Sequence, residues 1–175
     1  FGLVVERYTA GNRKSWDSLV NVGKNSSFLF RRDYMEYHQN RFYDCSLMVK
    51  RNDELIGLIP ANLCSDGQVT SHGGLTYGGI VIRKDATLRD SLEILEAVLE
   101  YFYAHNVTTL RYKKIPRFYN NVPDDDVDYF MFLSDARIFR RDCALVINQP
   151  GALPFRKGRK SEISKARRYD VALIE

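Results

Sequence analysis

The residues best suited to chemistry lie in a glycine-rich stretch, residues 72–79, which reads HGGLTYGG. Four glycines within seven residues allow close backbone approach, so this stretch predicts a loop that offers N–H groups to a ligand. His72 or Tyr77 could take up a proton beside that ligand. A bulge or a tight strand crossing explains the glycines equally well. The candidate substrate-binding residues of this stretch are His72, Gly73, Gly74, Tyr77 and Gly78.

A second candidate site is the basic segment, residues 156–168, which reads RKGRKSEISKARR. Seven Lys and Arg residues against the single carboxylate of Glu162 make its charge +6, whereas the whole chain carries +4, so the rest sums to −2 (4 − 6). Concentrated positive charge attracts anions, and guanidinium forks match phosphate oxygens. A charged helix face turned to solvent is the alternative interpretation. The candidate anion-binding residues are Arg156, Arg159, Lys160 and Lys165.

The remaining titratable residues favour neither a metal site nor a hydrolytic triad. His38, His72 and His105 are far apart and lack metal-ligand spacing. The aspartates within residues 124–128 are interpreted as N-terminal residues of a helix. No nucleophile elbow is recognisable. The sequence therefore predicts no metal and no covalently bound cofactor, and it assigns no catalytic residue.

The composition is typical of a globular protein, with 45% hydrophobic, 27% charged and 13% aromatic residues. A chain of 175 residues is long enough for one domain that buries about 70% of its unfolded surface. No apolar run approaches the ~20 residues of a membrane span, and the N-terminus lacks a signal-peptide pattern. We therefore expect a cytoplasmic protein without a membrane span.

The elements that must position these residues alternate between strand and helix patterns. Strands are predicted over residues 3–9, 45–50, 55–64, 68–71, 108–113, 137–148 and 171–174. Helices are predicted after Asn12 and after Ser26 or Ser27, and over residues 87–105, 124–136 and 158–170. Turns at residues 51–54 and 65–67 would fold residues 45–71 into an antiparallel meander. This order indicates a mixed α/β (α+β) fold in which helices cover a central sheet.

The helix over residues 87–105 has the clearest pattern. Its Leu and Phe residues recur at intervals of four, three, four and three, which predicts that this stripe faces the core. The stripe consists of Leu88, Leu92, Leu95, Leu99 and Phe102.

Four segments together resemble the first half of bacterial FemAB-like and GNAT-like N-acyltransferases. In chain order they read FLFRRDYMEYH, HGGLTYGGIVI, DYFMFLSDARIFRRDCALVIN and SEISKARRYDVALIE, and the resemblance spans residues 27–175. It implies a GNAT-like fold, with a mixed, largely antiparallel central sheet and helices on both faces. It also implies an acyl-CoA or aminoacyl-tRNA donor whose acyl group is transferred to an amine. The (Gln/Arg)-x-x-Gly-x-(Gly/Ala) pattern that holds the CoA pyrophosphate in GNAT enzymes is absent from the sequence.

The resemblance implies an organisation in two parts. Residues 1–155 would form one GNAT-like domain, and residues 156–175 would lead toward a second half outside this chain. We then expect the N-terminal domain of an N-acyltransferase, inactive alone, whose partners are the second half of the same protein and an anionic substrate or donor. The alternative is a non-catalytic module that binds an anion or nucleic acid through the basic segment. The absence of aromatic residues between Arg156 and Arg168 argues against nucleic acid.

Overall fold

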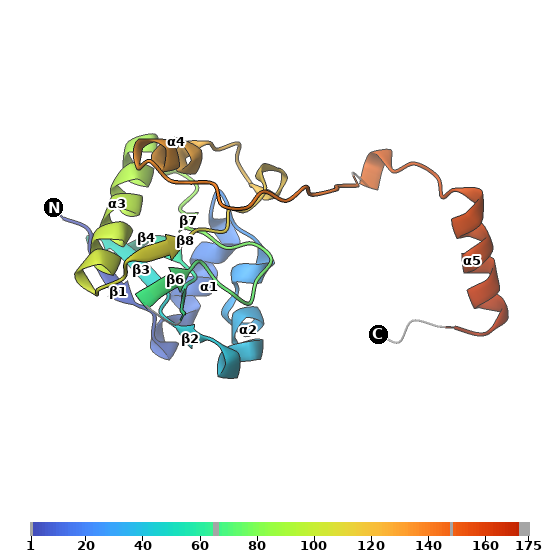
Figure 1. Cartoon of the computed structure of the whole chain (residues 1–175), viewed down its shortest axis with the longest axis horizontal. Helices are drawn as coiled ribbons and strands as arrows, with labels where there is room; N and C mark the ends of the chain where they lie inside the picture. Colours follow the sequence, from blue (N-terminus) through green and yellow to red (C-terminus); the bar gives the residue numbers. More distant parts are fainter. Residues whose placement is uncertain (1, 65–66, 148, 172–175) are drawn as a thin grey trace. The chain divides into compact units, whose positions relative to one another are not determined.

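The computed structural model describes residues 2–64, 67–147 and 149–171 (Figure 1). The chain divides into two compact units, Phe1–Ile138 and Phe139–Glu175. This boundary lies earlier than residue 155, because residues 139–147 form no strand that would join them to a sheet. None of the helices within the described residues combines the length and the apolar character that crossing a bilayer requires.

The first unit is a mixed α/β fold with two four-stranded sheets, in the orders β1-β3-β4-β7 and β2-β5-β6-β8. Its strands are β1 (Val4–Arg7), β2 (Tyr43–Asp44), β3 (Leu47–Arg51), β4 (Glu54–Ile59), β5 (Asn62–Leu63), β6 (Gln68–Thr70), β7 (Val81–Ile82) and β8 (Thr109–Arg111). Its α-helices are α1 (Arg13–Val22), α2 (Arg32–Met35), α3 (Leu88–Ala104) and α4 (Asp126–Leu133). Every pairing is antiparallel except that of β6 with β8. The prediction of a mixed, largely antiparallel fold is confirmed.

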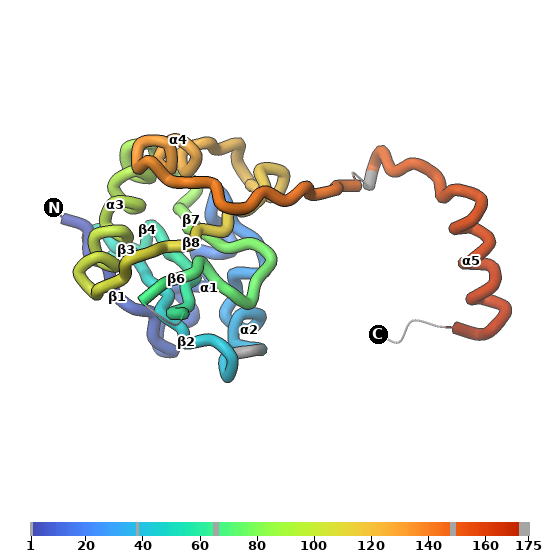
Figure 2. The backbone as a smooth tube through the Cα atoms, viewed as in Figure 1, coloured from blue at the N-terminus to red at the C-terminus, as the bar shows by residue number. Residues whose placement is uncertain are grey.

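Helices cover both faces of the first sheet. Alternate side chains of a strand point to opposite faces, and β3 places Leu47 and Val49 in one apolar cluster and Met48 in the other. The first cluster contains Ile94 of α3, and the second contains Trp16 of α1. Figure 2 shows the backbone of these two helices beside that of β3 and β4. The sheet is therefore the middle layer between α3 and α1.

The predicted turn at residues 51–54 is confirmed, residues 65–66 of the second predicted turn lie outside the described residues, and the predicted meander is wrong because β4 and β6 lie in different sheets. Asn52 and Asp53 join β3 to β4 with φ values of 50° and 63°, the left-handed region that Asn and Asp tolerate best among non-glycine residues. Thr87 caps α3 in a reciprocal capping box with Asp90.

The predicted apolar stripe of α3 is wrong in part. Leu88 is 46% exposed and Leu99 is 36% exposed, whereas Ile94 and Val98 are fully buried. The buried face is formed by Ser91, Ile94, Leu95, Val98 and Phe102. The helix carries two overlapping apolar stripes, and the sheet and α4 bury the one that includes the β-branched residues.

The helix predicted after Ser26 or Ser27 is broken into short turns. Ser27 caps the 3-10 turn η2 (Phe28–Phe30) by accepting a hydrogen bond from the Leu29 N–H. Arg31 then adopts an extended backbone with ψ of 142°, so α2 starts anew and continues into the 3-10 turn η3 (Glu36–Arg41). The break lets the Arg32 backbone N–H donate to Asp17 of α1 at 2.9 Å.

The aspartates before and within the first turn of α4 do more than start a helix. Lys24 is 5% exposed, and its Nζ lies 2.5 Å from Asp126 Oδ2, 3.5 Å from Asp124 Oδ2 and 3.1 Å from Ser91 Oγ. Asp128 instead pairs with Lys114 and Arg117. The cluster that was interpreted as a helix start therefore ties α4 to α3 and to the end of α1.

The second unit contains the helix α5 (Lys157–Arg168) but no strand among its described residues. The strand predicted over residues 137–148 is wrong for the described positions up to 147. Its apolar residues are not covered by the rest of the unit: Leu145 is 95% exposed and Ile147 is 72% exposed. A β-rich sequence forms a strand only when another strand satisfies its N–H and C=O groups. Of the strand predicted over residues 171–174, only Val171 lies within the described residues.

Candidate functional site

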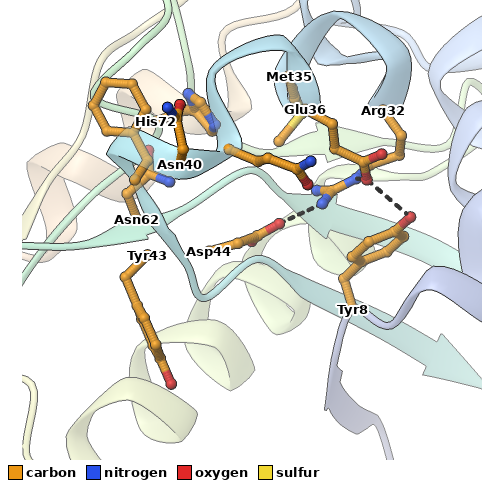
Figure 3. A pocket seen from close by; sticks show the side chains of 11 residues that line it. Tyr8, Arg32, Met35, Glu36, Asn40, Tyr43, Asp44, Asn62 and His72 are labelled. Carbon is orange, nitrogen blue, oxygen red and sulfur yellow. Dashed lines mark hydrogen bonds and ion pairs between the residues drawn. The ribbon is translucent and has the colours of Figure 1, made fainter.

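The first unit contains a cavity of about 390 Å³, called here the polar cavity (Figure 3). Its walls come from the end of β1, from α2 and η3, from β2 and β5, and from the start of the glycine-rich stretch. The lining residues with polar or aromatic side chains include Tyr8, Arg32, Glu36, Asn40, Tyr43, Asp44, Asn62 and His72. In the view of Figure 3, His72 and Asn62 lie on one side of the cavity, and Arg32 and Tyr8 lie on the other.

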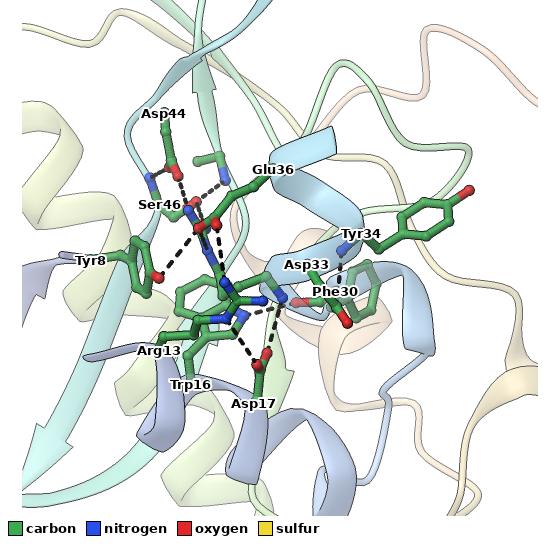
Figure 4. A network of polar contacts seen from close by, with 12 residues as sticks. Tyr8, Arg13, Trp16, Asp17, Phe30, Asp33, Tyr34, Glu36, Asp44 and Ser46 are labelled. Atoms are coloured by element: carbon green, nitrogen blue, oxygen red, sulfur yellow. Dashed lines mark hydrogen bonds and ion pairs between the residues drawn. The ribbon is translucent and has the colours of Figure 1, made fainter. Parts of the chain in front are cut away.

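Arg32 is the centre of a buried polar network, and Figure 4 labels its partners Glu36 and Asp44. Its side chain is 3% exposed, its Nε donates to Glu36 Oε1 at 3.0 Å, and an Nη donates to Asp44 Oδ2. The guanidinium carbon lies 3.6 Å from the centroid of the Tyr8 ring and 5.1 Å from that of Trp16. A desolvated cation over an aromatic face gains about 2 kcal/mol. The network holds this wall of the cavity in one geometry.

The charge of Arg32 sets the ionisation of its neighbours. Burial alone would raise the pKa of Asp44, but the charge and hydrogen bond of Arg32, with hydrogen bonds from Ser46, lower that pKa below its usual value. Burial raises the pKa of the Tyr8 hydroxyl, which donates to Glu36 Oε1 at 3.3 Å. At neutral pH this wall therefore presents an ionised carboxylate and a neutral phenol.

His72 lies in the cavity wall with an uncommon backbone and an unpaired ring atom. Its φ of 62° is in the left-handed region, and its carbonyl oxygen accepts from the Leu75 N–H and from Lys113 Nζ, both at 3.2 Å. Nδ1 is buried and has no hydrogen-bond partner among the described residues. Burial is the main cause that lowers the pKa of the imidazole to about 4. The ring is thus neutral at pH 7, and one of its nitrogens is an acceptor.

The glycines of residues 72–79 serve close packing. The Gly73 N–H donates to Asn62 Oδ1 at 2.9 Å, and the Gly78 N–H donates to the Lys113 carbonyl at 2.9 Å. A Cβ on Gly78 would lie 1.5 Å from the Ser71 carbonyl oxygen, and one on Gly74 would lie 2.5 Å from the Phe42 ring. These contacts support the interpretation of a tight crossing. The two N–H groups are used inside the protein rather than offered to a ligand.

The predicted substrate-binding residues of this stretch separate into two groups. His72 lines the polar cavity, and both His72 and Gly74 line a second cavity beside it. Gly73, Tyr77 and Gly78 line neither cavity. The Tyr77 ring packs instead at 5.5 Å from the Tyr119 ring, against the apolar cluster around Trp16. Of the two residues considered for proton uptake, His72 lines both cavities and Tyr77 lines neither.

The basic segment forms α5 in the second unit, as predicted. Arg156 is its N-cap residue, and Arg159, Lys160 and Lys165 are exposed on the helix. Among the described residues, the one carboxylate paired with an α5 cation is Glu162, 3.1 Å from Arg159. The predicted concentration of positive charge therefore faces solvent within this unit.

Sequence reasoning missed Arg32, Glu36 and Asp44. Arg32 and Glu36 stand within a segment whose aromatic residues recur at helical spacing, and their i, i+4 spacing was a usable signal for an ion pair. Asp44 is twelve residues from Arg32, and nothing local links them. The described residues bring together no group of His, Cys, Asp or Glu side chains suited to holding a metal ion.

Fold and site together define a mixed α/β domain that holds a buried Arg–carboxylate network and a neutral histidine at a cavity. No protein-family model matches the chain, and no curated protein matches it.

Proposed function

We propose that the chain is part of an N-acyltransferase and that the polar cavity receives the amine to be acylated. The observation that carries this proposal is the neutral imidazole of His72, which lines the cavity and has a ring nitrogen without a partner among the described residues. A neutral imidazole accepts a hydrogen bond from an uncharged amine and leaves the amine lone pair available for attack. The resemblance to FemAB-like and GNAT-like enzymes supports the same reaction.

The proposed reaction begins with attack of the amine nitrogen on the acyl carbon of a thioester or ester. The C–N bond forms as the C–S or C–O bond to the donor breaks, and the proton lost by the amine passes to the departing thiolate or alkoxide. With a pKa of about 4, His72 is a weak base. Its role is to orient the amine by a hydrogen bond rather than to accept the proton of the amine. The donor is an acyl-CoA or an aminoacyl-tRNA.

Replacement of His72 by Asn tests this role, because Asn tolerates the left-handed backbone of this position. In the full-length protein, we expect His72→Asn to lower amine-dependent release of thiol from acetyl-CoA about tenfold or more, the value of one lost hydrogen bond to the substrate. Tyr77→Phe is the control, and its rate should stay within about twofold of the wild type. If isothermal titration of the full-length protein showed binding of neither acyl-CoA nor aminoacyl-tRNA, the acyltransferase assignment would be wrong.

The exposed cations of α5 favour a second candidate function, binding of a polyanion. If α5 contacts about five phosphates of duplex DNA, affinity should fall roughly 500-fold between 50 and 200 mM salt. Fluorescence anisotropy with a labelled duplex measures this slope. Lys160→Ala should reduce the slope by about one unit, whereas Lys14→Ala in α1 should not change it. An affinity that is insensitive to salt would contradict polyanion binding.

A further inference from the structure

A second cavity, also of about 390 Å³, lies beside the polar cavity and is called here the aromatic cavity. Three aromatic rings and two aliphatic side chains dominate its walls, and its one carboxylate is Asp33. The lining residues are Asp33, Tyr34, Met35, Tyr37, Phe42, His72, Gly74 and Leu75. A cavity with such walls favours a flat apolar group, because rings gain both buried area and favourable ring–ring geometry.

The two cavities share one wall, which is formed by Met35, Phe42 and His72. The His72 and Phe42 ring centroids are 5.7 Å apart. Gly74 has no side chain to displace the Phe42 ring, so the ring stays in this wall. Met35 is 4% exposed, and its flexible thioether adapts to the shape of a neighbouring group. His72 therefore lies at the border of both cavities, where a ligand in either one would contact it.

The walls of the two cavities carry more carboxylates than cations, and Lys113 adds a cation beside them, because its Nζ lies 3.2 Å from the His72 carbonyl oxygen. Their walls contain one guanidinium, of Arg32, and three carboxylates, of Asp33, Glu36 and Asp44, which is a net charge of −2. Arg31 and Arg13 contact two of these carboxylates at 3.5 and 3.7 Å, and exposed pairs of that length contribute little. Because Arg32 is already paired with Glu36 and Asp44, an anionic ligand would have to compete with both.

We propose that the two cavities form one bipartite site for an arylalkylamine, a primary amine joined to an aromatic ring by a short aliphatic link. The amine occupies the polar cavity near His72, Glu36 and Asp44. The ring occupies the aromatic cavity against Tyr34 and Phe42. This inference rests on the proposed function, because it names the acceptor class of the same reaction. It also concerns binding alone, which is measurable without an acyl donor.

Calorimetric titration of the 175-residue chain with 2-phenylethylamine, ethylamine and 2-phenylethanol tests the proposal. The first probe carries both groups, the second lacks the ring and the third lacks the amine. We expect 2-phenylethylamine to bind about tenfold or more tightly than either of the others. Equal dissociation constants for 2-phenylethylamine and ethylamine would overturn the proposal, and so would tighter binding of 2-phenylethanol.

Tyrosine variants locate the ring of the probe. Tyr34 is 49% exposed, so Tyr34→Ala should leave the fold intact while it removes most of the preference for 2-phenylethylamine over ethylamine. Tyr37→Ala is a second variant on the same wall. Tyr103→Ala is the matched control, because Tyr103 is an 84% exposed residue of α3 that lines neither cavity. A ring preference that survives both Tyr34→Ala and Tyr37→Ala would place the ring elsewhere and overturn the assignment.

The two proposals fail in different experiments. If ethylamine supports thiol release and the ring adds no affinity, the acyltransferase proposal stands and the bipartite site is wrong. If 2-phenylethylamine binds with the expected preference but no donor transfers an acyl group to it, the bipartite site stands and the reaction is wrong.

Discussion

Replacement of Arg32 by Ala is expected to lower the free energy of unfolding of the first unit by about 3 kcal/mol. The guanidinium is buried between Glu36 and Asp44 and stacks on Tyr8. Its removal leaves two partly buried carboxylates with their desolvation cost and without their cation, and it leaves a hole beside the Tyr8 and Trp16 rings. Arg32→Lys should lower the free energy of unfolding by less, because lysine keeps the positive charge although it lacks the forked geometry of the guanidinium.

Urea unfolding followed by tryptophan fluorescence measures this loss. Trp16 is the one tryptophan of the chain and lies 5.1 Å from the Arg32 guanidinium, so the signal reports on the first unit. Arg31→Ala is the matched control. Its side chain is 41% exposed and pairs with Asp33 at 3.5 Å, so its loss should be less than about 0.5 kcal/mol. Similar losses for the two alanine variants would show that the Arg32 network does not hold this wall.

Acidification from pH 7 to pH 4 is expected to remove about 3 kcal/mol of stability through His72 alone. The imidazole has a pKa of about 4 in the folded chain, because burial and the charges of Arg32 and Lys113 outweigh the attraction of Asp44. Its ordinary pKa is 6.5. Between these values the unfolded chain binds a proton that the folded chain does not. The contribution is therefore complete above pH 6.5 and is lost as the pH falls toward 4.

The difference between wild type and His72→Asn isolates this effect, because Asn has no titrating ring. Asp44 also has a lowered pKa, so it too loses stability in acid, but it does so equally in both proteins and mainly below pH 4. Urea unfolding at half-unit steps from pH 4 to pH 7.5 gives the free energy of unfolding of each protein as a function of pH. We expect them to separate steadily from pH 6.5 downward. Parallel curves would mean that the pKa of His72 is the same in the folded and unfolded chains, so that burial does not hold the ring neutral.

Features that depend on neighbouring residues could be predicted from the sequence. The turn at Asn52 and Asp53, the Thr87 cap of α3 and the basic helix α5 all follow from residue types within a few positions of one another. The residues of α3 that face the core could not be predicted in this way. Both its leucines and its β-branched residues recur at helical spacing, and the sheet selects Ile94 and Val98 over Leu88 and Leu99.

The strand predicted over residues 137–148 is wrong for a different reason. Its apolar and β-branched residues favour an extended chain, but a strand requires hydrogen bonds from another strand. Whether a partner strand is present is a property of the tertiary arrangement. Within the described residues of the second unit, Phe139 to Ile147 form no such ladder.

For the site, the sequence by itself determined the glycine-rich stretch, with a ligand loop and a tight crossing as open alternatives, the choice of His72 and Tyr77 as polar groups beside it, and the mixed α/β class. Only the tertiary structure decided that His72 lies at a cavity and Tyr77 does not, and that Arg32 joins Glu36 to Asp44. The physical reason is one of range. Caps, turns and periodicity arise between residues a few positions apart, whereas burial and ion pairing depend on which distant segments exclude water from one another.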